Sequence, residues 1–209
     1  MEKFGKIKGL TMYYESDAGL LQMGLMLRFV NGDVSFDIED KIDYELNVLR
    51  ENPDRTPDYK RSFADLTYWK YKFLASPENK YRDLDKAYSY LKKAYKAGSP
   101  DAMAQYAYYY YTGSGITNTV DKQRAKKLFG KAMKKENLFV EFLIAEALLS
   151  EEDDDPRILR AAAAYYEKAI EKKVLECRPK LAGIYLQLKE NLDRAIELFK
   201  ASGNKYPLT

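Results

Sequence analysis

The stretch AKKLFGKA, Ala125 to Ala132, decides the fold because its pattern recurs at three other places in the chain. Each copy reads small residue, two spacers, two large apolar residues, two spacers, small residue. The other copies are AYSYLKKA from Ala87, AAAYYEKA from Ala162 and AIELFKAS from Ala195, at successive spacings of 38, 37 and 33 residues. Residues three, four and seven apart share one face of a helix, so each copy predicts a helix with a buried alanine stripe.

A second recurring unit lies upstream of three of these stripes and reads large, small, two spacers, large. Its copies are YAYYY at Tyr106–Tyr110, IAEAL at Ile144–Leu148 and LAGIY at Leu181–Tyr185, with a fourth, MGLML, at Met23–Leu27. The gap between the fourth copy and YAYYY is about two periods of a helix-pair repeat, which predicts a degenerate pair between them.

We therefore predict an all-α fold, a right-handed α/α superhelical solenoid of about five antiparallel helix pairs. The predicted pairs are 17–31 with 38–51, 58–75 with 83–97, 99–112 with 121–136, 137–150 with 157–172, and 175–188 with 191–202. Turn-forming segments such as NPDRTPD, AGSPD and TGSG fall between them. We expect one domain over 1–209, with degenerate pairs in 1–84, clear repeats in 85–202 and a tail at 203–209.

The segment Ala102–Ala132 resembles a Sel-one-like repeat, a branch of the tetratricopeptide superfamily. The resemblance rests on Ala102, the YA pair at Tyr106, Tyr110, the GSGI turn at Gly113–Ile116 and the following DKQRAKKLFGKA. Only this repeat carries the pattern in full. The resemblance implies an adaptor that assembles protein complexes through its curved surface, and it implies no catalytic residue.

The composition argues against most enzyme chemistry. The chain has no histidine and a single cysteine, Cys177, which removes most nucleophile–base pairs and transition-metal sites. The EEDDD run at Glu151–Asp155 lacks the spacing and glycine of a calcium loop, and is better explained as a solvated connection before a helix. We expect no enzyme activity and no cofactor or metal.

The chain reads as a cytoplasmic protein. Its N-terminus shows no signal-peptide pattern, and its longest apolar window, around Leu20–Val30, is too short to span a bilayer. A lone cysteine fits a reducing compartment. The 35 basic and 32 acidic side chains nearly balance, which makes nucleic acid an unlikely first partner.

The tyrosine run YAYYYY divides by helix geometry into two groups, because consecutive residues point about 100° apart. Tyr106, Tyr109 and Tyr110 fall near the packing stripe, whereas Tyr108 and Tyr111 share another face. In solenoids that resemble this one, the first helix of each pair lines the concave surface. We therefore predict a partner-binding face there, formed by Tyr108, Tyr111 and the corresponding positions Leu25, Arg28, Glu146, Leu149, Gly183 and Leu186.

An alternative site is the basic helix at 121–135, which carries seven basic residues against one acid. Its basic face consists of Arg124, Lys127, Lys131 and Lys135, opposite an apolar arc of Ala125, Leu128, Phe129, Ala132 and Met133. This face could bind nucleic acid or an acidic partner, or be the solvated outer side of a second helix. No base-stacking aromatic residues are interleaved with it, which weakens the nucleic-acid interpretation.

The first functional hypothesis is therefore a non-catalytic scaffold or adaptor that captures a partner protein or peptide on its concave face. Nucleic-acid or acidic-partner binding through the basic helix is the second hypothesis. A neutralising, immunity-type partner of a toxin or effector is a third. Self-association through the ends of the solenoid, including the tail with Tyr206 and Leu208, is a further possibility.

Overall fold

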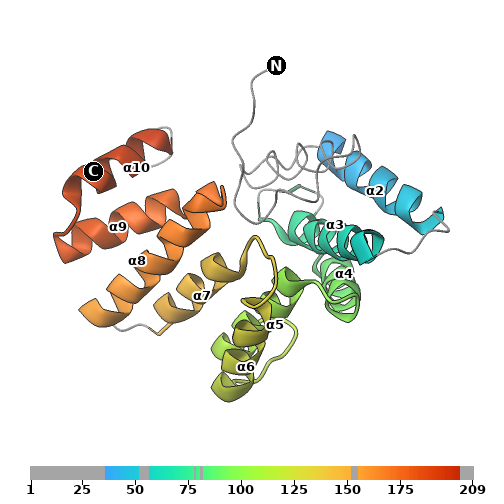
Figure 1. The fold of residues 1–209 in the computed structure, drawn as a ribbon, viewed down its shortest axis with the longest axis horizontal. Coiled ribbons are helices and arrows are strands. Elements are labelled where there is room, and N and C mark those ends of the chain that lie inside the picture. The colour runs from blue at the N-terminus through green and yellow to red at the C-terminus, as the bar shows by residue number, and fades with distance from the viewer. Residues whose placement is uncertain (1–35, 52–56, 78, 81, 152–154, 203–209) are drawn as a thin grey trace. The chain divides into compact units, whose positions relative to one another are not determined.

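The structure, a computed structural model, describes residues 36–51, 57–77, 79–80, 82–151 and 155–202. Within those ranges the regular structure consists of α-helices and one short 3-10 helix, with no strand. This confirms the predicted all-α fold class. The elements are α2 (Phe36–Glu51), α3 (Pro57–Ala75), α4 (Leu84–Lys96), α5 (Pro100–Thr112), α6 (Lys122–Ala132), α7 (Val140–Leu149), α8 (Pro156–Glu171), η1 (Leu175–Cys177), α9 (Arg178–Leu188) and α10 (Leu192–Ala201) (Figure 1).

The predicted helix bounds agree with these elements to within a few residues. The largest differences lie at the end of α6, which stops at Ala132, and at the starts of α7 and α9, which begin at Val140 and Arg178. The predicted helix at 17–31 lies outside the described residues. In the described part of the chain, no helix combines the length and apolar character needed to cross a bilayer.

The chain divides into two compact units, Met1–Met103 and Ala104–Thr209, and the division falls within α5. The single domain expected for 1–209 stays a prediction. In unit 1, α3 packs against both α2 and α4. In unit 2, α7 packs with α8 and α9 with α10, while α6 packs against α7 and α8 against α9. Figure 1 shows α7 to α10 following one another in chain order.

Helix α3 forms the core of unit 1. Its aromatic residues Tyr68, Trp69, Tyr71 and Phe73 are all buried. Lys70 is buried as well, and its Nζ lies 2.7 Å from Asp43 Oδ2 on α2. A buried ammonium needs such a partner because an isolated charge is costly to remove from water. The ion pair therefore joins the two helices of the degenerate part of the chain.

The alanine stripes occupy the helix interfaces, as the sequence predicts. The first small residues of all four copies are fully buried, and so are the last small residues of the first three. These residues are Ala87, Ala125, Ala162, Ala195, Ala94, Ala132 and Ala169. The turns after Ala94 and Ala169 are also alike, because Ser99 N–H and Val174 N–H donate to the carbonyls of these alanines at 3.1 and 3.0 Å. The repeat thus extends from side-chain packing to the backbone of the helix ends.

The glycine turn between α5 and α6 is closely packed. Gly115 has φ +61°, and a Cβ placed on it would lie 2.5 Å from the ring of Tyr109. Only glycine combines this backbone conformation with this close approach. Asp121 then caps α6 by accepting a hydrogen bond from Arg124 N–H at 2.8 Å.

Candidate partner-binding surface

The repeat register assigns six of the sequence-predicted positions to two rows on α5, α7 and α9. Tyr108, Glu146 and Gly183 occupy the same position of the repeat unit, and three residues later Tyr111, Leu149 and Leu186 occupy another. We call these six residues the first-helix surface. The remaining predicted positions, Leu25 and Arg28, lie outside the described residues.

Glu146, the α7 member of the first row, makes polar contacts with side chains of α8 and α9. Lys180 of α9 donates to both Glu146 oxygens at 2.6 Å. The hydroxyl of Tyr166 on α8 also donates to Glu146 Oε1. Burial, and secondarily the negative charge of Glu146, raise the pKa of Tyr108. The carboxylate is therefore already engaged within unit 2 and helps to fix α7 against α8 and α9.

The second row begins with a cluster at the end of α5. The Tyr111 hydroxyl donates to Glu151 Oε1, and Lys122 Nζ lies 2.8 Å from the same oxygen. Lys122 also lies 5.0 Å from the centroid of the Tyr111 ring. Burial and the hydrogen bond to Glu151 raise the pKa of Tyr111 to about 12. The hydrogen bonds from Lys122 and Tyr111 lower the pKa of Glu151.

The α9 end of the surface is open. Gly183 is exposed, and a Cβ placed on it would meet no atom within 4 Å. Leu186, one turn further along α9, is 42% exposed. The surface thus runs from two half-buried tyrosines with polar partners to a bare backbone position beside an exposed leucine. A partner segment can approach most closely at Gly183.

The tyrosines assigned to packing have specific neighbours. Tyr109 lies under Gly115, and its carbonyl accepts a hydrogen bond from the Thr117 hydroxyl at 3.0 Å. The ring of Tyr110 faces the guanidinium of Arg124 on α6 at 4.2 Å. All five tyrosines of the run are half-buried. The run therefore holds the turn and α6 in place as well as contributing to the first-helix surface.

The basic face differs from its prediction in two respects. Because α6 ends at Ala132, Lys135 lies beyond the helix that carries Arg124, Lys127 and Lys131. Met133 is 43% exposed and does not belong to the buried apolar arc, since it is the residue that ends the helix. Lys127 and Lys131 are exposed, whereas Arg124 covers the Tyr110 ring. The face is thus shorter than predicted.

The acidic connection has structural roles where the structure describes it. Asp155 accepts a hydrogen bond from Arg157 N–H at 2.8 Å and so caps α8, as expected for acids before a helix. Glu151 binds Tyr111 and Lys122. Among the described residues, no group of three or more acidic or cysteine side chains could hold a metal ion.

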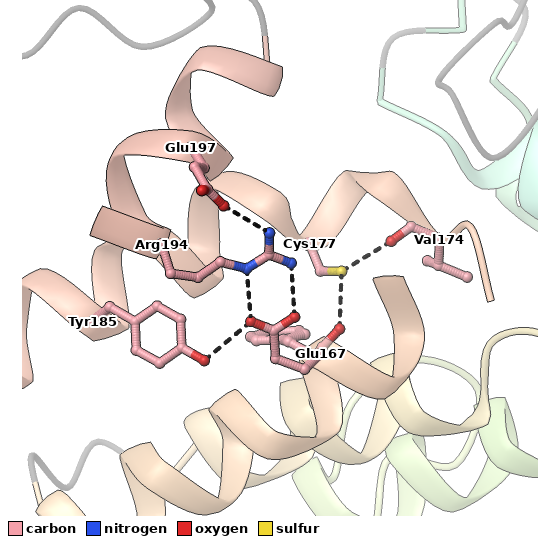
Figure 2. Close-up of polar contacts among 7 residues, drawn as sticks. Glu167, Val174, Cys177, Tyr185, Arg194 and Glu197 are labelled. Carbon is pink, nitrogen blue, oxygen red and sulfur yellow. Dashed lines mark hydrogen bonds and ion pairs between the residues drawn. The ribbon is translucent and has the colours of Figure 1, made fainter. Parts of the chain in front are cut away.

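Polar contacts also connect α8, α9 and α10 in unit 2 (Figure 2). Arg194 binds Glu167 through two hydrogen bonds of 3.1 and 3.0 Å, and the Tyr185 hydroxyl donates to the same carboxylate at 3.1 Å. The Cys177 thiol donates to the Val174 carbonyl at 3.0 Å, and burial raises the pKa of Cys177 to about 12. This thiol is a buried structural group.

Sequence patterns missed the residues that tie the first-helix surface together. Lys122, Glu151 and Lys180 were not among its predicted members, because they lie 29 to 40 residues from the partners they bind. In the sequence, only the repeat spacing indicates that residues so far apart could lie close together. The repeat register assigns Tyr108 and Glu146 to the same position, but the other copies have no lysine at the position of Lys180.

Comparison with protein families agrees with this arrangement. The model of the Sel1 repeat matches residues 79–99, 100–137, 157–174 and 181–205. The matched segments include α4 to α6 and large parts of α8, α9 and α10. Sel1 repeats generally mediate protein–protein interactions. No curated protein matches the chain.

Proposed function

The chain is a Sel1-repeat protein of the tetratricopeptide-like superfamily, and from this premise we propose that it binds a partner protein through the first-helix surface. The proposal is a non-catalytic scaffold or adaptor. The observation that carries it is the open end of the surface at Gly183 and Leu186 on α9. The two half-buried tyrosines occupy the corresponding positions on α5. Tyrosine and leucine side chains beside an accessible backbone suit an extended peptide or a helix.

The fixed side chains support the proposal because they reduce the entropy lost on binding. The Tyr111 hydroxyl and the Glu146 carboxylate are already held by partners on neighbouring helices. A surface that is ordered before binding loses less conformational freedom when the partner arrives. Such a surface keeps affinity at high salt, because its contacts are mainly apolar or already neutralised within unit 2.

The proposal can be tested by a substitution that fills the open position at Gly183. Gly183→Arg places a long side chain where a partner would approach, without a clash inside the protein. Gly130→Arg is the matched control, since Gly130 is also a helical glycine with nothing within 4 Å and lies on α6, outside the surface. We expect wild type and Gly130→Arg to retain the same protein from native lysate at high salt, and Gly183→Arg and a Tyr108→Ala/Tyr111→Ala variant to lose it.

The outcomes separate the hypotheses. Equal retention by all four proteins would overturn the first-helix surface as the binding site. Capture that disappears with salt or nuclease, and with Lys127→Glu/Lys131→Glu, would transfer the function to the basic face. Mass spectrometry of the retained protein distinguishes a complex subunit from a toxin or effector, and so tests the neutralising role.

A further inference from the structure

Helices α8 and α10 have equivalent apolar faces, but only the face of α8 is buried. When Ala162 and Ala195 are aligned, Leu159, Ala163 and Tyr166 of α8 correspond to Leu192, Ile196 and Phe199 of α10. The three α8 residues are buried, because α8 packs between α7 and α9. On α10, Leu192 is 48% exposed, Ile196 is 50% exposed and Phe199 is half-buried. We call these three residues the α10 face.

The charges beside the α10 face have the opposite sign to those beside the α8 face. On α8, Arg160 binds Glu190 at 2.7 Å and Glu167 binds Arg194 at 3.0 Å. The corresponding α10 residues are Asp193 and Lys200, both exposed. A neighbour on the α10 face therefore needs a cation opposite Asp193 and an anion opposite Lys200.

A second copy of α10 meets this requirement. Asp193 and Lys200 are seven residues apart, so they lie two turns apart on the same flank of the helix. In an antiparallel pair of α10 helices, related by a two-fold axis near Ile196, Asp193 of each copy faces Lys200 of the other. We propose that the α10 face is an isologous dimer contact that this chain makes with a second copy of itself.

The contact is small, because one face of a ten-residue helix supplies it. Interfaces at this lower size limit form weak and reversible complexes. The dimer therefore dissociates at micromolar concentrations, and sedimentation velocity between about 1 and about 200 μM covers its equilibrium. This contact is independent of the partner proposed for the first-helix surface.

The experiment measures dimerisation of the full chain and of four variants. Ile196→Glu is expected to abolish the dimer, whereas Met133→Glu, at an exposed apolar residue that ends α6, is expected to retain it. Asp193→Lys and Lys200→Asp are each expected to weaken the dimer about tenfold. In either variant, residues 193 and 200 carry the same charge, so both of the symmetry-related pairs across the two-fold axis become repulsive. Circular dichroism checks that the variants remain helical.

The decisive sample is a one-to-one mixture of Asp193→Lys with Lys200→Asp. One variant then presents two cations and the other two anions, so the mixture is expected to form dimers at least as readily as wild type. A fold defect in either variant cannot produce this gain. A monomeric wild type at the highest concentration, a dimer unaffected by Ile196→Glu, or a mixture no better than its components would overturn the proposal.

Discussion

Two tyrosine-rich helices, α3 in unit 1 and α5, whose tyrosines belong to unit 2, use similar residues in different ways. In α3 the rings of Tyr68, Tyr71 and Phe73 are buried and form a core. In α5 no tyrosine of the run is fully buried, and the hydroxyl of Tyr111 binds the carboxylate of Glu151, in the segment that follows α7. Aromatic content alone therefore does not separate a core helix from a surface helix. In α5 the buried side is formed by small residues, Ala104 and Ala107, so the tyrosines are left in half-buried positions.

The largest effect is expected in α3. Phe73→Ala removes a side chain with 0% exposure and leaves a cavity, which should lower the free energy of unfolding by about 3–5 kcal/mol. Trp69 lies on the same helix and is the single tryptophan of the chain, so urea unfolding followed by its fluorescence reports on unit 1. Tyr111→Ala is the matched change in α5, and urea unfolding followed by circular dichroism measures the loss in both variants. An equal loss in the two variants would contradict the comparison.

A smaller effect is expected at the turn that follows α5. Gly115→Ala combines a positive φ with a Cβ 2.5 Å from the Tyr109 ring, and should destabilise unit 2 by about 1–3 kcal/mol. Gly130→Ala is the control, because it lies in helix α6 with free space and should stabilise by about 0.5–1 kcal/mol. Urea unfolding followed by circular dichroism measures both. If the two glycines responded alike, the turn would not constrain the tyrosine.

A pH dependence distinguishes Tyr111 from an exposed tyrosine. Its pKa is raised to about 12 in the folded protein, against an ordinary value of 10. The neutral hydroxyl therefore favours the folded state, and this contribution is complete below pH 10 and is lost as the pH rises towards 12. Between these values wild type should lose more stability than Tyr111→Phe. Unfolding in urea at pH 9 and pH 11 measures the difference, and parallel losses would show that the hydroxyl does not interact as described.

The smallest effect is expected on the basic face. Lys127 and Lys131 are exposed, so Lys127→Glu/Lys131→Glu should change the free energy of unfolding by less than about 0.5 kcal/mol. Retention of the protein on heparin is expected to remain weak before and after the change. A wild type that elutes only at high salt, with early elution of the variant, would give the basic face a role in binding polyanions, separate from the role proposed for α5.

The sequence predicted the helix pairs well because the alanine stripe and the glycine turn have direct physical causes. Small residues permit close helix packing, and only glycine fits the positive φ of Gly115 beside an aromatic ring. The division into compact units and the ion pair between Lys70 and Asp43 could not be read from periodicity, since both depend on contacts between helices. The predicted end of α6 was wrong because the helical sequence pattern continues through Met133 to Lys135, whereas the helix itself ends at Ala132.

The partners within the candidate surface were the least predictable part. Glu151 was taken for a solvated connection, although it accepts hydrogen bonds from Tyr111 and Lys122. Its role follows from the contact between the end of α5 and the segment after α7, and no local pattern encodes that proximity. Long-range polar contacts of this kind need a three-dimensional arrangement before their members can be chosen from 67 charged side chains.

The buried thiol of Cys177 gives the protein a useful chemical property. It is the single cysteine of the chain, and as a thiol with a raised pKa it will react slowly with maleimides while the fold is intact. A cysteine introduced at an exposed position will therefore carry a fluorophore or photocrosslinker at one defined place in the native protein. Lys127→Cys and Gly183→Cys would place such a probe on the two competing surfaces without altering the natural residue at 177.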